Sequence, residues 1–267
     1  MKYAINAKRL VAVRSPIQES VSKMRISVVT VCYNAENTIR DTIESVINQD
    51  YGDFEYVIMD GASSDGTMDI INEYKENDHL TCYSEPDSGL YDAMNKSLDR
   101  LTGDYVIFMN SGDMFYDDHV LGDIAPGLKS DIVYGDAYKR RIDGDYTEKY
   151  KGTHFERMKM MLCGAFFCHQ AQFTKTEVMR RYGFREDHRI TADFDFLVRT
   201  LAGKCSFGHV DRIICSFDEN DGISAQKSNY LQMIKEDDTS VRECFPFLYY
   251  LTIIPKTIFR IVFRPEY

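Results

Sequence analysis

The sequence lacks any long apolar segment. None of its runs approaches the ~18 apolar residues that a membrane-spanning helix needs, and its first residues contain no apolar signal core. The 267 residues are therefore expected to lie in the cytoplasm rather than to cross a bilayer or be secreted. An excess of positive charge is also lacking, since the formal net charge is −10. A nucleic-acid-binding protein presents a basic face to phosphates, so that class is disfavoured.

A paired set of metal-binding cysteines is missing too. Most of the seven cysteines stand beside apolar or aromatic residues, which is typical of reduced core thiols in a cytosolic protein. Cys163, Cys168 and His169 are close together, but no second Cys/His pair has matching spacing, which disfavours a zinc site. The apolar content of 44% supports a real core, in one large domain or two closely packed halves.

Several common ligand-binding motifs are absent. No G-x-x-x-x-G-K-[ST] loop occurs, which disfavours a P-loop ATPase. No G-x-G-x-x-G follows an expected strand, and no G-x-S-x-G nucleophile motif is present. A nucleotidyltransferase would need a basic, glycine-rich loop after the first strand, where residues 34–37 read Asn-Ala-Glu-Asn. A ligand of this protein is therefore expected to bind through carboxylates and a metal rather than through a glycine-rich loop.

Short apolar runs alternate with helical patterns in the first half of the chain. Strands are expected at residues 26–32, 54–59, 80–84 and 105–109. Helices are expected after a capping Asn37, from about Thr67 to Lys75, and over 90–101. This alternation predicts an α/β fold with a mostly parallel central sheet flanked by crossover helices.

The second half has a looser pattern. Strands are expected at 131–134, 145–150 and 213–217, and helices at 176–182 and 192–202. We divide the chain into an N-terminal extension (1–24), a first half (25–115), a smaller α+β half (116–220) and a C-terminal helical tail (221–267). No repeat or low-complexity linker separates the halves, so they are expected to pack together.

Polar residues follow three of the expected strands directly. They are Tyr33 and Asn34 after the first strand, Asp60 after the second, and residues 110–113 (Asn-Ser-Gly-Asp) after the fourth. In open α/β sheets, ligands bind at the carboxyl ends of the strands. Asp113 is therefore a candidate ligand for a hard divalent cation. The alternative is that residues 110–113 form only a turn, since these are ordinary turn residues.

These segments resemble the family 2 glycosyltransferases of bacterial surface-polysaccharide type, which have a Rossmann-like GT-A fold that binds nucleotide sugars. The resemblance rests on ordered motifs in the first half: the strand and loop at 26–34, Asp60-Gly61 through Thr67, the helix start at 85–96, and Gly103 through Asp113. A shorter similarity covers 167–173 and 190–199. It implies that residues 25–115 bind the nucleotide sugar and 116–220 the acceptor.

The resemblance implies inverting transfer of one sugar from a nucleotide-diphosphate donor to a hydroxyl of a saccharide or lipid-linked acceptor. Asp193 is the candidate general base. Burial beside Phe194 and Phe196 is expected to raise its pKa toward working pH. The alternative is that Asp193 caps its helix, and Asp195 is expected to point elsewhere. Mn²⁺ or Mg²⁺ held by Asp113 would act as a Lewis acid on the diphosphate.

The remaining candidates contact the donor or the acceptor. Tyr33 is expected to stack on the nucleoside and Asp60 to hydrogen-bond it; the alternatives are a core tyrosine and a helix-capping aspartate. Asp87 either touches the donor or starts its turn, and Asn110 is assigned to donor binding. His169 either hydrogen-bonds the diphosphate or acceptor, or is a satisfied core histidine.

Two positions depart from the family pattern. The metal motif keeps only its last carboxylate, Asp113, so the donor diphosphate would supply most metal ligands. Asp60-Gly61 stands where many relatives have two acids. The thin acid content leaves an alternative function open, that of a catalytically silent nucleotide-sugar-binding protein or partner subunit.

The tail carries a cationic pattern. Lys256, Arg260 and Arg264 are spaced by four and would form one stripe on a helix, with isoleucines opposite. This suits peripheral binding to an anionic cytosolic leaflet, where each cation contributes ~1 kcal/mol, and a lipid-linked acceptor would then be natural. The alternative is a helix docked on the protein's own core, since Pro246 and Pro255 interrupt the segment.

Overall fold

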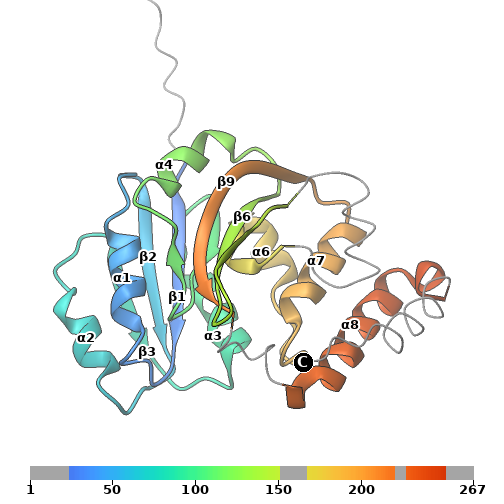
Figure 1. The fold of residues 1–267 in the computed structure, drawn as a ribbon, viewed down its shortest axis with the longest axis horizontal. Coiled ribbons are helices and arrows are strands. Elements are labelled where there is room, and N and C mark those ends of the chain that lie inside the picture. Colours follow the sequence, from blue (N-terminus) through green and yellow to red (C-terminus); the bar gives the residue numbers. More distant parts are fainter. Residues whose placement is uncertain (1–23, 151–166, 220–226, 251–267) are drawn as a thin grey trace, which may run out of the picture.

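The computed structural model describes residues 24–150, 167–219 and 227–250. Within them, nine strands form one sheet with helices around it (Figure 1). The strands are β1 (Ile26–Cys32), β2 (Phe54–Asp60), β3 (Leu80–Ser84), β4 (Tyr105–Phe108), β5 (Met114–Phe115), β6 (Ile132–Arg140), β7 (Tyr146–Glu148), β8 (Gln172–Lys175) and β9 (Phe207–Asp218). The α-helices are α1 (Ile39–Ile47), α2 (Thr67–Glu73), α3 (Leu90–Ser97), α4 (Val120–Ile124), α6 (Thr176–Tyr182), α7 (Ala192–Ala202) and α8 (Tyr230–Cys244). The 3-10 helices are η1 (Leu98–Arg100), η2 (Ala125–Gly127), η3 (His169–Ala171) and η5 (Lys227–Asn229).

The first four strands of the sheet are parallel, as the alternating pattern predicts. Their order is β3-β2-β1-β4. Every residue of β1 and β4 is buried, and α1 and α3 both pack against β1. A parallel strand covered on both faces needs apolar side chains at nearly every position, which explains the continuous apolar runs in the sequence. The carboxyl ends of these four strands lie at one edge of the sheet.

Beyond β4 the sheet becomes mixed. β8 pairs antiparallel with both β4 and β6, and β9 runs parallel to β6. β5 and β7 add antiparallel pairs with β9 and β6. The sheet thus runs through both predicted halves of the chain. The sequence pattern missed β8 because its residues, Gln-Phe-Thr-Lys, contain a single large apolar side chain.

The helices observed in the second half agree with the sequence-based prediction more closely than the strands do. The helices α6 and α7 cover the residues predicted for them. β9 begins at Phe207 rather than residue 213, because its first half is polar and only half-buried. The expectation that Asn37 caps the first helix is wrong, since α1 begins at Ile39 behind Thr38, which makes no side-chain capping hydrogen bond.

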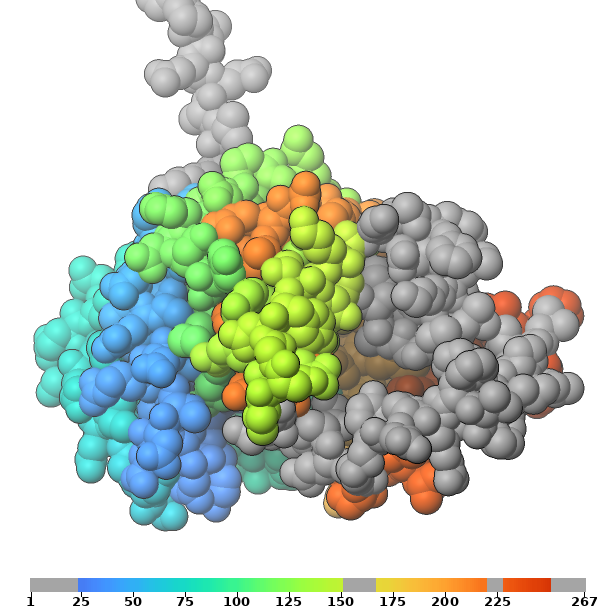
Figure 2. All heavy atoms as spheres, in the orientation of Figure 1, coloured from blue at the N-terminus to red at the C-terminus, as the bar shows by residue number. Residues whose placement is uncertain are grey.

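The helix α8 packs on α7 at one end of the molecule (Figure 1). It buries Glu236, Ser240 and Val241. In the space-filling view the first half, in blue to teal, forms one side, and the yellow-green residues of β6 and β7 lie on the face in view (Figure 2).

Among the described residues, no helix is both long enough and apolar enough to cross a bilayer. The six cysteines within these ranges are free thiols. Cys163, residues 1–23 of the predicted N-terminal extension and the cationic stripe of the tail lie outside the described residues.

Candidate active site

A cavity of about 810 Å³ lies where the loop after β4, the end of β6 and the start of α7 meet. Four of the predicted site residues line it: Asn110, Asp113, His169 and Asp193. The sequence separates them by as many as 83 positions, the interval from 110 to 193. The antiparallel pairing of β8 with β4 brings His169 to Asn110 and Asp113, because it places the residues just before β8 beside the loop that follows β4.

A hydrogen-bonded chain joins three of these side chains. The Asn110 amide nitrogen lies 3.0 Å from His169 Nε2, and His169 Nδ1 lies 3.4 Å from Asp193 Oδ2. His169 therefore bridges Asn110 and Asp193 through its two ring nitrogens. His169 is therefore not merely a core histidine, since it orients one carboxylate oxygen of Asp193 at the cavity wall.

Tyr91 of α3 holds the other oxygen of Asp193. Its hydroxyl lies 3.3 Å from Asp193 Oδ1 and 3.0 Å from the Ile190 carbonyl oxygen. Sequence reasoning did not select Tyr91. The only signal in the sequence is its place in the 85–96 segment that carries the family resemblance. The periodic apolar pattern of this helix does not indicate that the Tyr91 hydroxyl has a role in the site.

The expected pKa shift of Asp193 is wrong in direction. Burial does raise the pKa, but the hydrogen bond and charge of His169, with the Phe194 N–H and the Tyr91 hydroxyl, lower it overall. The pKa of His169 is raised, because the Asp193 carboxylate outweighs the burial that opposes its protonation. Asp193 is thus ionised at neutral pH. The Phe194 amide donates to it at 2.9 Å, but α7 begins one residue before Asp193, so Asp193 is not the helix cap.

Asp195 belongs to a different environment. Its side chain is fully buried. Oδ2 accepts from Arg199 at 2.6 Å, and Oδ1 accepts from Ser240 of α8 at 2.8 Å. Asp195 therefore joins α7 to α8 and does not line the cavity, as the sequence predicts.

Asp113 stands at the end of a real turn that also presents it to the cavity. Its N–H donates to the Asn110 carbonyl oxygen at 2.9 Å, and Gly112 has φ +97°, a conformation that glycine adopts without strain. Burial raises the pKa of Asp113 to about 6, while His169 and a hydrogen bond from Gln170 limit the rise. The turn and the ligand site, posed as alternatives from the sequence, are compatible.

Arg140 was also missed by the sequence analysis. Its Nη2 donates to the Gly112 carbonyl oxygen at 3.3 Å, and its Nε is buried with no hydrogen-bond partner among the described residues. The neighbouring Lys139 is neutralised by Glu148 at 2.7 Å and Glu219 at 2.9 Å. The strand was predicted only to residue 134, so nothing in the sequence placed Arg140 beside the Asp113 turn.

The other predicted residues form a second group, at the carboxyl ends of β1, β2 and β3. A Cβ added to Gly61 would lie 2.5 Å from Asp87 Oδ2 and 3.3 Å from Tyr33 Cδ2. Glycine at position 61 is therefore what lets Asp87 approach the backbone beside Tyr33. Tyr33 is 65% exposed, which excludes the alternative of a core tyrosine. Asp87 accepts from the Gly89 N–H at 2.9 Å and so does form its turn.

Asp60 is buried beneath this group. Its side chain is 1% exposed and accepts from the Ser63 N–H at 3.1 Å and from the Ser84 hydroxyl at 2.6 Å. It is not a helix cap, because α2 begins at Thr67 and its N-cap residue is Gly66. Asp60 thus ties the loop after β2 to the end of β3.

The residues that could hold a divalent cation are few. Within 24–150, 167–219 and 227–250, no three His, Cys, Asp or Glu side chains are arranged as a metal site. Asp113 is the predicted ligand, and near it Asn110 Oδ1 is buried without a hydrogen-bond partner in the described part of the chain. A carboxylate and an unused amide oxygen fit a hard cation whose other ligands come from a bound diphosphate.

Comparison with known proteins agrees with this geometry. The family model described as glycosyl transferase family 2 matches residues 27–186. A PGL/p-HBAD biosynthesis glycosyltransferase of Mycobacterium bovis is 30% identical over 208 residues, covering 74% of this chain and 78% of the relative.

Two solved structures share the fold. Staphylococcus aureus TarS 1–349 in complex with UDP-GlcNAc superposes with a TM-score of 0.67 at 18% identity, covering 82% of this chain and 67% of that one. The mannosyltransferase PcManGT from Pyrobaculum calidifontis, in complex with GDP-Man and Mn²⁺, gives a TM-score of 0.59 at 18% identity, over 85% and 64% of the two chains. The fold is the mixed α/β GT-A arrangement expected from the sequence, and the chain belongs to glycosyl transferase family 2.

Proposed function

We propose that this protein transfers one sugar, with inversion, from a nucleotide-diphosphate donor to a hydroxyl of an acceptor. The observation that carries the proposal is the arrangement of one cavity. Asp193 lines it in ionised form, oriented by His169 and Tyr91, and Asp113 lines the same cavity after β4. A base and a site for the leaving group are the two elements that displacement at an anomeric carbon needs.

In this mechanism Asp193 accepts the proton of the attacking hydroxyl. The hydroxyl oxygen bonds to the anomeric carbon, the bond from that carbon to the diphosphate breaks, and its electron pair stays on the diphosphate oxygen. His169 and Tyr91 fix the two carboxylate oxygens, so Asp193 meets the acceptor in one orientation. Because its pKa is lowered, the base is available at neutral pH without prior loss of a proton.

Asp113, with Asn110 Oδ1 beside it, is the proposed holder of Mn²⁺ or Mg²⁺. When bound, such a cation stabilises the negative charge that develops on the leaving diphosphate. PcManGT, which shares the fold, was solved with GDP-Man and Mn²⁺. Arg140 Nε, buried and unpartnered within the described ranges, adds positive charge at the same wall.

The nucleoside is proposed to lie over the second group. Tyr33 offers an exposed ring for stacking, and Asp87 approaches it across Gly61. Asp60 stabilises the loop after β2 and the end of β3 beneath this group through its hydrogen bonds with Ser63 and Ser84, in addition to its proposed contact with the nucleoside.

We propose a saccharide or lipid-linked acceptor in surface polysaccharide or glycolipid synthesis, in the cytoplasm or peripherally on the cytosolic leaflet. The named relative acts in PGL/p-HBAD biosynthesis.

A screen of UDP- and GDP-sugars tests the proposal. A donor is expected to raise the melting temperature of the full chain in the presence of Mn²⁺ and not in EDTA, because ligand binding stabilises the folded state. The stabilising donor is then offered with saccharide and polyprenyl-phosphate acceptors, and nucleotide release and product are measured. Donor binding with neither sugar transfer nor donor hydrolysis would favour the alternative function, a catalytically silent nucleotide-sugar-binding protein. No stabilisation by any nucleotide sugar would contradict the proposal.

A further inference from the structure

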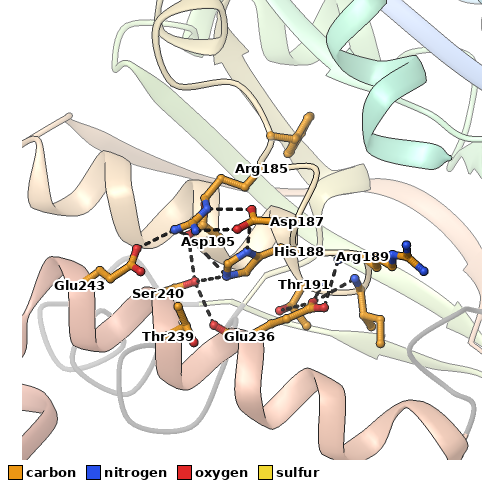
Figure 3. A network of polar contacts seen from close by, with 12 residues as sticks. Arg185, Asp187, His188, Arg189, Thr191, Asp195, Glu236, Thr239, Ser240 and Glu243 are labelled. Atoms are coloured by element: carbon orange, nitrogen blue, oxygen red, sulfur yellow. Dashed lines mark hydrogen bonds and ion pairs between the residues drawn. The ribbon is translucent and has the colours of Figure 1, made fainter. Parts of the chain in front are cut away.

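Glu236 of α8 holds the loop that leads into the proposed base. Its side chain is 6% exposed. Oε2 accepts hydrogen bonds from the Ile190 and Thr191 N–H groups, both at 3.0 Å. Oε1 accepts from the Arg189 N–H at 3.0 Å and from the Gln232 amide at 2.8 Å. Three successive peptide N–H groups thus converge on one carboxylate, as Figure 3 shows for the loop beside α8.

This carboxylate is an anion. Burial alone would raise the pKa of Glu236, but the hydrogen bonds from Gln232 and from the three peptide N–H groups lower it overall. Hydrogen bonds to an ionised acceptor are roughly twice as strong as neutral ones. The loop is therefore fixed to α8 by the strongest kind of hydrogen bond that backbone amides can make.

The same loop is fixed from its other side by Tyr91. The Tyr91 hydroxyl donates to the Ile190 carbonyl oxygen at 3.0 Å and lies 3.3 Å from Asp193 Oδ1. Thr191 is the N-cap of α7, and its carbonyl oxygen accepts the Asp195 N–H at 3.0 Å in the first helical turn. Glu236 and Tyr91 thus set where α7 begins and, two residues later, where Asp193 lies.

Other residues of α8 also hold this helix in place. Val241 is 1% exposed and packs in the core. Ser240 bonds Asp195 at 2.8 Å, and Glu243 bonds Arg185 at 2.6 Å (Figure 3). Burying a charge carries a desolvation penalty that an apolar residue would avoid, so a carboxylate at position 236 calls for a role beyond attachment. The family model ends at residue 186, so α8 lies outside the matched segment.

We propose that Glu236 is a positioning residue for the transfer step, a role that rests on the proposed function. By holding the N–H groups of residues 189–191 it fixes the start of α7 and so the distance from Asp193 to the acceptor hydroxyl. A displacement of ~1 Å in a catalytic group costs about 100-fold in rate. Losing Glu236 is therefore expected to lower kcat and leave donor binding intact, because Tyr33, Asp60 and Asp87 lie on other elements.

The test compares Glu236→Gln and Glu236→Ala with the matched control Glu243→Gln in the full chain. Gln keeps one acceptor oxygen of the same reach, so kcat is expected to fall about tenfold in Glu236→Gln and about 100-fold in Glu236→Ala. The donor KM and the affinity for UDP with Mn²⁺ should stay within about twofold of wild type. Glu243→Gln removes a charge from the same helix without touching the loop and should keep wild-type kcat.

Hydrogen–deuterium exchange supplies a second reading that needs no substrate. Exchange at residues 189–191 should be faster in both Glu236 variants and unchanged in Glu243→Gln. Wild-type kcat in Glu236→Ala, or equal losses in kcat and UDP affinity, would overturn the positioning role. Should the wild type transfer no sugar, the proposed function fails, and exchange alone then decides whether the Glu236 contact orders the loop: unchanged rates at 189–191 would overturn that contact as well.

Discussion

Two aspartates on α7 show how much a single side chain depends on its environment. Asp193 and Asp195 are two positions apart, which places them about 200° apart around the helix. Asp195 is fully buried against Arg199 and Ser240, and Asp193 lines the cavity. The sequence predicts that the two point apart. It does not predict that His169, 24 positions upstream, lowers the pKa of Asp193, because that shift depends on a contact between distant segments.

The role of Asp193 predicts a separation of binding from chemistry. Asp193→Asn keeps the shape of the side chain and removes the base, so transfer should fall by about 10²- to 10⁴-fold while UDP affinity in Mn²⁺ stays unchanged. Initial rates and isothermal calorimetry measure the two quantities. Asp41→Asn, which alters another acid lining the cavity, is the control for charge. Wild-type turnover in Asp193→Asn would move the base elsewhere.

The raised pKa of Asp113 predicts a pH dependence for metal binding. The folded-state pKa is about 6, above its ordinary value, so the carboxylate is protonated over a range in which an exposed aspartate is ionised. Since a cation binds only the ionised form, Mn²⁺ affinity in the presence of UDP should be constant above about pH 6 and fall up to tenfold per pH unit below it. Calorimetry from pH 5 to 8 measures this. Asp113→Asn should bind Mn²⁺ weakly at every pH, and a pH profile equal to wild type in that variant would contradict the assignment.

At the scale of elements, the regular part of the fold follows from local pattern and the site does not. The helices α6 and α7 and the four parallel strands could be predicted, because burial on both faces or on one stripe leaves a periodic apolar signal. β8 and the first half of β9 could not, since their side chains are mixed or half-exposed. The site depends on these unpredicted strands. β8 brings His169 beside Asn110, and the extension of β6 to Arg140 brings a cation beside Asp113.

The close approach of Asp87 to Gly61 predicts that adding a single methyl group at position 61 will weaken UDP binding. In Gly61→Ala the new Cβ would lie 2.5 Å from Asp87 Oδ2, so the Asp87 side chain must turn away while the backbone can stay in place. UDP affinity is expected to fall at least about tenfold, because one hydrogen bond to a charged group contributes about 1.5–3 kcal/mol. Calorimetry measures the affinity, and thermal melting checks that the fold is kept.

The control for this change is Gly122→Ala in α4, whose Cβ would lie 3.0 Å from Asp50 Oδ1. It also displaces an aspartate, but one outside the proposed donor site. Equal losses of UDP affinity in both variants would show that the effect is general. Wild-type affinity in Gly61→Ala would remove Asp87 from the donor site.

At the scale of the whole molecule, one sheet joins the predicted donor and acceptor halves. The cavity draws its lining from both, since Asp113 lies in the first and His169 and Asp193 in the second. The helix α8 adds a third contribution through the loop at residues 189–191. Sequence pattern located each part but not this convergence, because pairings between distant strands leave no local signal. Neither the donor half nor the acceptor half is therefore expected to be active alone.

The cationic tail predicts membrane binding that depends on charge. Lys256, Arg260 and Arg264 would each contribute ~1 kcal/mol at an anionic surface, so changing all three to Gln should weaken partition about 100-fold. Flotation of the full chain with vesicles containing phosphatidylglycerol measures this, and binding should fall as salt screens the charges. Removing Lys2, Lys8 and Arg9 at the other end is the matched control and should leave flotation unchanged. Since the triple variant keeps its isoleucines, neutral vesicles should bind both proteins equally and weakly. Equal flotation of wild type and the tail variant on anionic vesicles would instead place the stripe in solvent, with the helix docked on the protein itself.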